Sequence, residues 1–585
     1  MSRRVQRVLL LSNGFGGATM AAYCWLRDRG IRTAFQPATS AAAMLDADLW
    51  YAPDLIVAPT LTTRVPAELF GKVVINHPGR IGDRGASSID WGRWRRERFG
   101  GTTLLLAADG WDTGDVVHTT TFAYPREPAT KSWIYSHLNR AALLRGLERL
   151  VDEPPPEPRP LDYAHADVLG RWNDALRAGD STVDWSLTAD EVVWRAAARD
   201  GAPGVRAELL GEVVSVFDVH PAGPARGEPG EVVGWLPDSA VRVTVGPADG
   251  DGRRESVWVG YVKSAGFKQP AAWWLAGRRR FPGRPDEPLP YRPVTTRLRG
   301  SVAVITAAAY NGAWSTGFCR AVAAAVTAAA RRTDVDQIVL RGGGTGPFGN
   351  GINLNHVYGA PAGIITEARA NIRAINQVAL ALFQARRDGV AVLVLLDGDA
   401  GAGGAFLSLC GDAVVAVPGR TFNYHYVGMG GLTGSEFHTL TLPARMPDAD
   451  ARAGLLHDCL PLSAHQAHRQ GLVDYLAPAG LDGADLTEWM HEFAVNHRDA
   501  GKRADRQRWR PLPTEAELAA TQERELRRID ADFASQEFQA ALADFVLKRR
   551  GAPPRAATEY RGAYSGSSRI RNVSMPGSES WSVNA

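Results

Sequence analysis

The sequence predicts a multidomain α/β protein whose N-terminal part holds a parallel sheet. Three observations lead to this prediction. The chain has 585 residues, which is more than one hydrophobic core usually organises, so two to four domains are expected. Strand-like apolar runs alternate with helical stretches up to about residue 150 and again from residue 299, as in parallel sheets covered by helices. Between these parts, short runs with alternating apolar residues predict a small β-barrel.

Composition and charge argue against several classes of function. The 66 basic and 63 acidic residues nearly balance at +3, which gives no support for a nucleic-acid or membrane-surface partner. The four cysteines share no metal or disulfide spacing, and none of the 13 histidines forms a metal-ligand cluster, so no metal is expected. The first apolar run is too short to span a membrane. We therefore expect a cytoplasmic protein.

Residues 1–155 are predicted to form the first α/β domain. "VLLLS" is a buried strand, and the helical stretch after it ends at Gly30; "IRTAFQPA", "DLIVAPT", "KVVINH" and "TTLLLAA" are further strands. The turn "SNGFGGATM" lacks the G-x-G-x-x-G spacing, which favours a plain strand-to-helix turn over a phosphate site. Ligands of such sheets bind beyond the strand ends.

His77 and Asp112 are the candidate catalytic residues of this domain. His77 follows the strand "KVVINH", and Asp112 lies in the loop after "TTLLLAA". An imidazole and a carboxylate that converge at a sheet edge suit acyl transfer, because the ring can stabilise or protonate a tetrahedral intermediate while the carboxylate orients it. Alternatively, His77 is a turn histidine that only binds backbone groups.

A second domain and two linkers are predicted next. The proline-rich "DEPPPEPRP" is a linker, and residues 156–265 hold the expected barrel, with Thr188 as a helix N-cap and no catalytic residue. Residues 266–298 form a second linker. Its run Arg278, Arg279 and Arg280 either grips phosphates of a nucleotide-like cofactor or is a solvated basic segment.

Residues 299–490 are predicted to form another α/β domain. Two glycine-rich segments, "FGNGINLN" and "GDAGAGGAFLSLCGD", each follow a predicted strand. Helix N-termini carry free backbone N–H groups, so two such turns aimed at one carbonyl would form an oxyanion hole. The alternative is a pair of ordinary tight turns. A helical extension at 491–550 and a disordered tail at 551–585 complete the prediction.

The first half resembles a known family. "HPG…GDRG.SS.DW" followed by "DTGD" is similar to the formyltransferases that use 10-formyltetrahydrofolate, and its Gly-Asp-Arg-Gly-x-Ser-Ser version resembles the HypX-type hydrogenase maturation factors. The resemblance implies catalysis by His77 and Asp112, with a cofactor site lined by Asn76, Asp83, Arg84, Ser87 and Ser88. The usual asparagine position holds Ile75, and Asn76 is adjacent to the histidine instead.

The second half resembles the crotonase (enoyl-CoA hydratase/isomerase) superfamily, whose members bind acyl-CoA thioesters. The resemblance implies that the amides of Ile352 and Gly403 form the oxyanion hole. The two glutamates of hydratases are replaced by Phe406 and Tyr426, so water addition to a double bond is not expected. "NYHYVGMGGLTGSE" supplies Tyr426 and Glu436 instead.

Together the resemblances imply a two-step synthesis of carbon monoxide, with 10-formyltetrahydrofolate and coenzyme A as cofactors. The first half would transfer the formyl group to coenzyme A, and the second half would split formyl-CoA into CO and coenzyme A. Tyr426 and Glu436 would move the protons, and the CO would become a ligand of a [NiFe]-hydrogenase. Hydrogenase maturation proteins are possible partners. Three alternatives remain: an N-formyltransferase of a biosynthetic pathway whose crotonase half acts on another thioester, a module that only binds coenzyme A, and an assembly scaffold.

Overall fold

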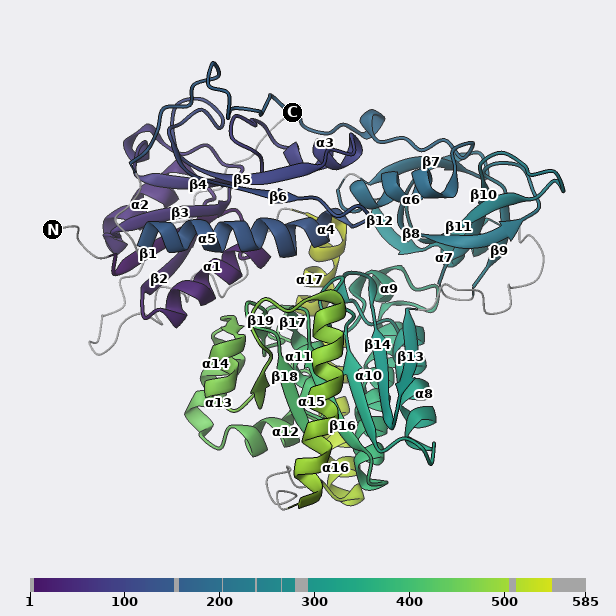
Figure 1. The fold of residues 1–585 in the computed structure, drawn as a ribbon. Coiled ribbons are helices and arrows are strands. Elements are labelled where there is room, and N and C mark those ends of the chain that lie inside the picture. Colours follow the sequence, from purple (N-terminus) through teal and green to yellow (C-terminus); the bar gives the residue numbers. More distant parts are fainter. Residues whose placement is uncertain are drawn as a thin grey trace.

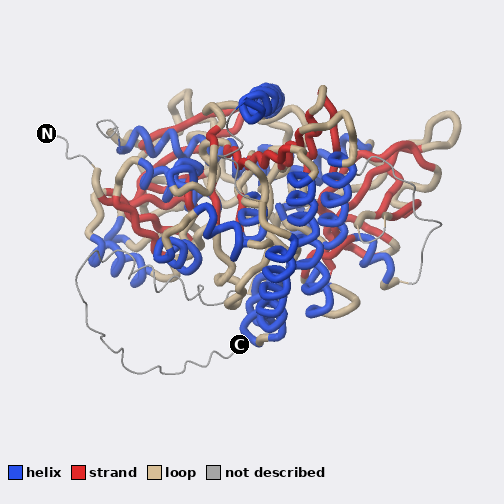
Figure 2. The backbone as a smooth tube through the Cα atoms, turned by 90° about the horizontal axis from the view of Figure 1, so that it is seen from below, coloured by secondary structure: helices blue, strands red, loops and turns tan. Residues whose placement is uncertain are grey.

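The computed structural model describes residues 5–151, 157–202, 204–236, 239–264, 266–278, 293–503 and 512–549. These residues form three six-stranded sheets and one three-stranded sheet. Figure 1 shows the first two sheets side by side at the top and the third below them. In the view from below, the part of the molecule farthest from the N-terminus is built mainly of strands (Figure 2). No helix in the described ranges is long and apolar enough to cross a membrane.

The first sheet has the order β2-β1-β3-β4-β5-β6. Four parallel strands match the predicted runs: β1 (Arg7–Ser12), β2 (Arg32–Pro37), β3 (Leu55–Thr60) and β4 (Val73–His77). The other elements are α1 (Gly17–Asp28), α2 (Ala41–Tyr51), α3 (Ser88–Trp94), β5 (Phe99–Leu106), β6 (Val116–Ala123), α4 (Lys131–Ile134), a π-helical turn (Tyr135–Asn139) and α5 (Arg140–Val151).

The sheet is mixed rather than wholly parallel, because β5 runs antiparallel to both β4 and β6. Residue periodicity predicts that a strand exists but carries no information about its direction. This difference matters for the site, since Leu106 at the end of β5 pairs with Val74, three residues before His77. The loop that carries Asp112 therefore leaves the sheet toward the beginning of β4 and folds back to reach His77.

The second sheet is antiparallel and contains β7 (Val205–Leu209), β8 (Glu212–Ala225), β9 (Val232–Trp235), β10 (Val241–Val245), β11 (Arg254–Ser264) and β12 (Phe267–Pro270). Helices α6 (Ala189–Ala198) and α7 (Ala271–Ala276) accompany it. Thr188 caps α6 as predicted, because its side chain accepts a hydrogen bond from the Glu191 amide. The predicted small barrel is not confirmed: in the described residues this sheet is open, with β7 and β9 at its edges.

The third sheet has the order β13-β14-β15-β16-β18-β21. Its strands are β13 (Val294–Arg299), β14 (Val302–Ala307), β15 (Gln337–Arg341), β16 (Ala391–Leu396), β18 (Ala413–Ala416) and β21 (Tyr475–Leu476). A smaller sheet pairs β17 (Ala400–Gly401), β19 (Thr421–Asn423) and β20 (Leu462–Ser463). The accompanying helices are α8 (Thr316–Ala330), α9 (Leu354–Gly359), α10 (Ile364–Arg387), α11 (Ala402–Ser408), α12 (His438–Arg445), α13 (Ala449–His457) and α14 (Ala464–Arg469).

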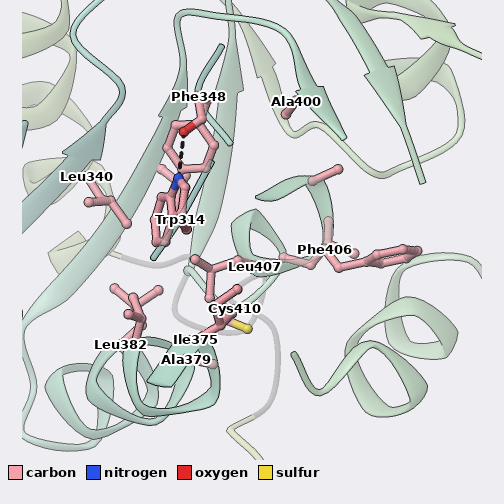
Figure 3. Packing of buried hydrophobic residues seen from close by; sticks show 14 of the residues in the cluster. Trp314, Leu340, Phe348, Ile375, Ala379, Leu382, Ala400, Phe406, Leu407 and Cys410 are labelled. Atoms are coloured by element: carbon pink, nitrogen blue, oxygen red, sulfur yellow. Dashed lines mark hydrogen bonds between the residues drawn. The ribbon is translucent and has the colours of Figure 1, made fainter. Parts of the chain in front are cut away.

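The core of this unit fixes the first glycine-rich turn. Trp314 is buried, and its indole N–H donates to the carbonyl of Phe348 at 3.1 Å. Figure 3 shows this bond beside Ile375 and Leu382 of α10 and Leu407 of α11. A buried Trp N–H that has found an acceptor holds both partners in place, so the turn after Phe348 begins from a rigid point.

Three long helices end the described chain: α15 (Gly483–Arg503), α16 (Glu515–Ala534) and α17 (Gln536–Leu547). Helix α16 packs on α10, and α17 contacts α9 and β12. Figure 1 shows α17, in yellow, rising from the lower unit toward the upper ones. The predicted helical extension is thus tied into the fold. The predicted disordered tail, 551–585, lies outside the described residues.

Candidate active sites

His77 lies at the end of β4 with only 4% of its surface exposed. Its Nδ1 is 3.3 Å from Oδ1 of Asp112, and its Nε2 is 3.3 Å from the hydroxyl oxygen of Ser88 at the start of α3. The two residues predicted to be catalytic therefore meet, and Ser88 joins them. An imidazole held at both nitrogens has a fixed ring orientation, which proton transfer requires.

Asp112 is held in an unusual backbone conformation. Its φ is +53°, a left-handed value that non-glycine residues seldom adopt, and its Oδ2 accepts a hydrogen bond from the Gly85 amide at 2.9 Å. Burial raises the pKa of this carboxyl, but the hydrogen bond and charge of His77, the Gly85 amide and the charge of Arg84 outweigh it, so the pKa is lowered. An ionised Asp112 favours the His77 tautomer with its proton on Nδ1.

The Gly-Asp-Arg-Gly turn is held by a segment that follows the proline-rich stretch. Asp83 accepts hydrogen bonds from the amides of Arg80 and Arg171, both at 3.0 Å. Arg84 donates to the carbonyl of Trp111 at 3.0 Å. Ser87 accepts a hydrogen bond from the Leu176 amide at 3.3 Å. These bonds shape the turn around Asp112; Ser88 alone among the predicted cofactor-lining residues is bonded to His77.

Asn173 is part of this site and was not predicted. It is 4% exposed, and its amide nitrogen donates to the hydroxyl of Ser88 at 3.2 Å. Asn173 and Ser88 are 85 positions apart, and the surrounding "RWND" carries no local signal. A bridge between Arg84 and Trp172 shows that this segment crosses the turn.

Asn76 points away from His77. Neighbouring residues of a strand face opposite sides of the sheet, and the Asn76 amide donates to the Pro59 carbonyl on β3 at 3.0 Å. Arg278 pairs through two hydrogen bonds with Glu212, at 2.7 and 2.6 Å, and stacks on Trp274. Its guanidinium is already engaged, so the structure lends no support to a phosphate-binding role, and Arg279 lies outside the described residues.

The two glycine-rich turns of the second half lie against each other. The amide of Gly401 donates to the carbonyl of Gly349 at 2.8 Å, and a Cβ placed on Gly351 would lie 3.1 Å from the Gly403 nitrogen. Gly403 belongs to the first turn of α11, where backbone N–H groups have no acceptor within the helix. Hydrogen bonds hold the backbone on both sides of Ile352: the Trp314 amide donates to the Gly351 carbonyl, and the Asn353 amide donates to the Trp314 carbonyl. The predicted juxtaposition of the two turns is present.

Tyr426 and Glu436 meet beside these turns. The Tyr426 hydroxyl donates to Oε2 of Glu436 at 2.6 Å, and the Ser435 amide donates to the same oxygen at 3.0 Å. The other oxygen, Oε1, lies so close to Gly403 that a methyl group there would overlap it. Burial raises the pKa of Glu436 to about 7, against the hydrogen bond from Tyr426 and with the help of the Glu525 charge. Burial and the Glu436 charge raise the pKa of Tyr426 as well.

The segment that carries Glu436 is strained. Glu436 and Phe437 both have φ of +59°, a conformation that costs about 1–3 kcal/mol for each non-glycine residue. Asn376 of α10 accepts from the Glu436 amide at 3.1 Å, and Glu525 of α16 accepts from the Phe437 amide at 2.9 Å. Both supporting residues are buried and neither was predicted, because each comes from a helix far away in the sequence.

Phe406 is fully buried and stacks on Tyr426, with ring centroids 4.8 Å apart. The position that the sequence predicts to replace the first glutamate of hydratases therefore holds a packed aromatic ring. In the described part of the chain, no group of three or more His, Cys, Asp or Glu side chains could hold a metal ion.

Comparison with known proteins shows similarity over almost the whole chain. It is 32% identical to the hydrogenase maturation factor HoxX of Bradyrhizobium diazoefficiens over 538 residues, which cover 90% of this chain and 92% of that protein. The crystal structure of HypX from Aquifex aeolicus in complex with tetrahydrofolic acid matches with a TM-score of 0.82 and 28% identity, over 95% of this chain and 98% of that one.

A third of the chain is also similar to a methionyl-tRNA formyltransferase. The methionyl-tRNA formyltransferase of Syntrophus aciditrophicus is 27% identical over 205 residues, which cover 33% of this chain and 63% of that enzyme. No family model matches the chain.

Proposed function

The chain belongs to the HoxX/HypX family of hydrogenase maturation factors, and from this premise we propose that it makes carbon monoxide in two steps. The first step moves the formyl group of 10-formyltetrahydrofolate to the thiol of coenzyme A at His77. The second splits formyl-CoA into CO and coenzyme A at Glu436. The CO then serves as a ligand of the [NiFe]-hydrogenase iron.

The first step needs a base and a group that stabilises an oxyanion. The coenzyme A sulfur attacks the formyl carbon, a tetrahedral intermediate forms, and the bond to the folate nitrogen breaks as that nitrogen gains a proton. With Asp112 bound at Nδ1, the Nε2 of His77 is the nitrogen free to exchange a proton. The hydroxyl of Ser88, 3.3 Å from Nε2, would relay it. Folate binding is stated for the Aquifex aeolicus relative and extends to this chain as part of the proposal.

The second step requires a proton to leave the formyl carbon and one to reach the sulfur. As the C–H proton is taken, its electron pair stays on the carbon that becomes CO, and the C–S electron pair leaves with sulfur. Tyr426 occupies Oε2 of Glu436, so Oε1, beside Gly403, is the oxygen available to the substrate. A carboxyl with a pKa of about 7 can accept the formyl proton and return it to sulfur at neutral pH. The amides of Ile352 and Gly403 would polarise the carbonyl.

The observation that carries the proposal is the Tyr426–Glu436 pair, bonded at 2.6 Å and packed against the turn of Gly403. The test is to incubate the purified protein with 10-formyltetrahydrofolate and coenzyme A, and to measure formyl-CoA and CO separately. Wild type should produce CO. Glu436→Gln and Tyr426→Phe should still consume the folate but release CO about a hundred- to ten-thousandfold more slowly. Normal CO release by both variants would place the second step elsewhere.

A further inference from the structure

Helix α16 forms hydrogen bonds to both ends of residues 433–439, the segment that contains Glu436 (the Glu436 segment). Near one end of the segment, Asp532 accepts hydrogen bonds from the amide and hydroxyl of Thr433 at 2.8 and 2.7 Å. Glu525, on the same helix, reaches the other end and is only 1% exposed. The strained residue Glu436 lies between these two attachments, and Phe437, which is strained as well, belongs to the second.

Glu525 makes an unusually complete set of bonds for a buried carboxylate. Oε2 accepts from the Phe437 amide at 2.9 Å, and Oε1 accepts from the amide and hydroxyl of Thr439 at 2.9 and 2.6 Å. Phe437 and Thr439 stand at the beginning of α12, so the carboxylate also faces the positive end of that helix. The hydroxyl of Ser435 donates to Oε2 at 3.3 Å. Glu525 thus holds Glu436 through its two neighbours in the chain, by the hydroxyl of Ser435 and the amide of Phe437.

We propose that Glu525 is a positioning residue for the second step: it holds the Glu436 segment in its left-handed conformation and places a second negative charge beside the Glu436 carboxyl. The inference rests on the proposed function. An ordinary N-cap comes from the residue that precedes the helix. Here the group that caps α12 is Glu525, which belongs to another helix and lies 86 positions from Thr439 in the sequence. The capped residue Phe437 directly follows Glu436, the proposed base, and so fixes its position.

The charge of Glu525 also acts on the protonation of Glu436. Glu436 interacts electrostatically with Tyr426 on its own segment, with Cys319 of α8, and with Cys410 and Glu525. His438, two residues further on, interacts with Glu525 and Arg528. Burial is the largest cause of the raised Glu436 pKa, and the charge of Glu525 raises it further. Burial lowers the pKa of His438, 3.5 Å from Glu525, despite that charge. Removing the Glu525 charge should therefore let Glu436 ionise at lower pH.

Two substitutions of Glu525 distinguish its role in positioning the Glu436 segment from the effect of its charge on the Glu436 carboxyl. Glu525→Gln removes the charge, and its amide can accept on only one of the two oxygen positions. We expect slower CO release from supplied formyl-CoA, by up to about a hundredfold, and an infrared band of the protonated Glu436 carboxyl that titrates on the order of one pH unit lower. Glu525→Asp keeps the charge on a shorter side chain, so CO release should fall while the titration midpoint stays near that of wild type.

The matched control is Asp530→Asn. Asp530 lies on the same helix but bonds Arg369 of α10 at 3.1 Å, away from the Glu436 segment, so both readouts should match wild type. The infrared band is assigned by its loss in Glu436→Gln. Formyl transfer at His77 should be unchanged in the Glu525 variants.

The inference is overturned if both Glu525 variants release CO at the wild-type rate and their Glu436 infrared band titrates at the wild-type midpoint. It is also overturned if Asp530→Asn changes the CO rate and the midpoint as much as the Glu525 variants do. If wild type itself releases no CO from formyl-CoA, the proposed function fails. The infrared midpoint then still decides whether Glu525 sets the protonation of Glu436.

Discussion

At the scale of single residues, His77 is the clearest test of the first site. His77→Ala removes the side chain that bridges Asp112 and Ser88. Formyl-CoA formation should fall about a hundred- to ten-thousandfold, while CO release from supplied formyl-CoA stays normal, because Glu436 belongs to the other half. Liquid chromatography of the folate and thioester products measures the first effect, and CO bound by reduced haemoglobin measures the second.

The control is His165→Ala, which removes an exposed histidine from the segment after the proline-rich stretch. It should consume 10-formyltetrahydrofolate at the wild-type rate. Unchanged folate consumption by His77→Ala would rule out the assigned role of His77.

The raised pKa of Glu436 leads to a second prediction, which concerns how the stability of the folded protein depends on pH. A glutamate in an unfolded chain titrates near 4.3, whereas burial raises the pKa of Glu436 to about 7 in the folded protein. Because the folded state binds this proton more tightly, the stability gained is complete below about pH 4 and is lost as the pH rises through 7. Glu436→Gln cannot ionise. Relative to wild type it should therefore gain stability between pH 5 and pH 8, by roughly 3 kcal/mol.

Thermal unfolding of both proteins at pH 5 and pH 8 measures this gain as a change in the difference between their midpoints. Glu523→Gln is the control, since Glu523 is a surface residue that pairs with Arg527 on the same helix, so its replacement should not reproduce the gain seen for Glu436→Gln. A pH-independent difference for Glu436→Gln would mean that Glu436 is ionised throughout this range.

At the scale of elements, the beginning of α11 depends on having no side chain at Gly403. A methyl group there would overlap Oε1 of Glu436, the oxygen assigned to the substrate. Gly403→Ala should thus displace the carboxyl and lower CO release about a hundredfold, because misplacing a catalytic group by about 1 Å costs roughly that much, while formyl transfer stays intact. Gly317→Ala on α8 is the matched control, because a Cβ there meets no atom within 4 Å. CO release equal in the two variants would contradict the assignment.

Elements that depend on local signals were predictable from the sequence. Strands β1 to β4 and β14 to β16 follow apolar runs, and Thr188 caps α6 through a bond within four residues. The direction of β5 and the openness of the second sheet were not predictable, because both depend on which strands become neighbours.

The candidate sites divide in the same way. His77, Asp112, Tyr426 and Glu436 stand in recognisable motifs, and the structure brings each pair together. The residues that support these groups come from far away in the sequence: Asn173 bonds Ser88 from 85 positions away, Asn376 bonds Glu436 from 60, and Glu525 bonds Phe437 from 88. Their surroundings carry no motif, since any segment that packs at the right place could supply an amide or a carboxylate.

At the scale of the whole molecule, an ion pair joins the two halves that carry the proposed steps. Arg140 of α5 is 4% exposed, and both terminal nitrogens of its guanidinium bond the carboxylate of Asp399, Nη1 at 2.8 Å. The Thr421 amide donates to the same carboxylate at 2.9 Å. Burial raises the pKa of Asp399, but the charge and hydrogen bonding of Arg140, with help from Arg420 and Thr421, lower it to about 2.

The lowered pKa fixes the sign of the pH dependence. Stability from the ion pair is fully present above about pH 4, where an unfolded aspartate is already ionised, and is lost as the pH falls toward 2. At neutral pH, removing one partner of a fully buried pair costs about 3–5 kcal/mol, because the other charge stays buried. The Asp399 side chain is 23% exposed, so water screens part of this cost and about 2 kcal/mol is a better expectation.

Arg140→Met should therefore destabilise the contact between the halves by about 2 kcal/mol at pH 7. Adding Asp399→Asn should recover part of the loss, because the unpaired charge is gone while the Thr421 amide keeps its acceptor. Calorimetry should show two separated unfolding transitions in Arg140→Met that move together again in the double variant. Arg469→Gln is the control: Arg469 also joins the halves, bonding Asp28 at 3.0 Å, but its side chain is 60% exposed. Exposed pairs contribute about 0–1 kcal/mol, so equal effects of the two single substitutions would show that the halves are not held by the Arg140–Asp399 pair.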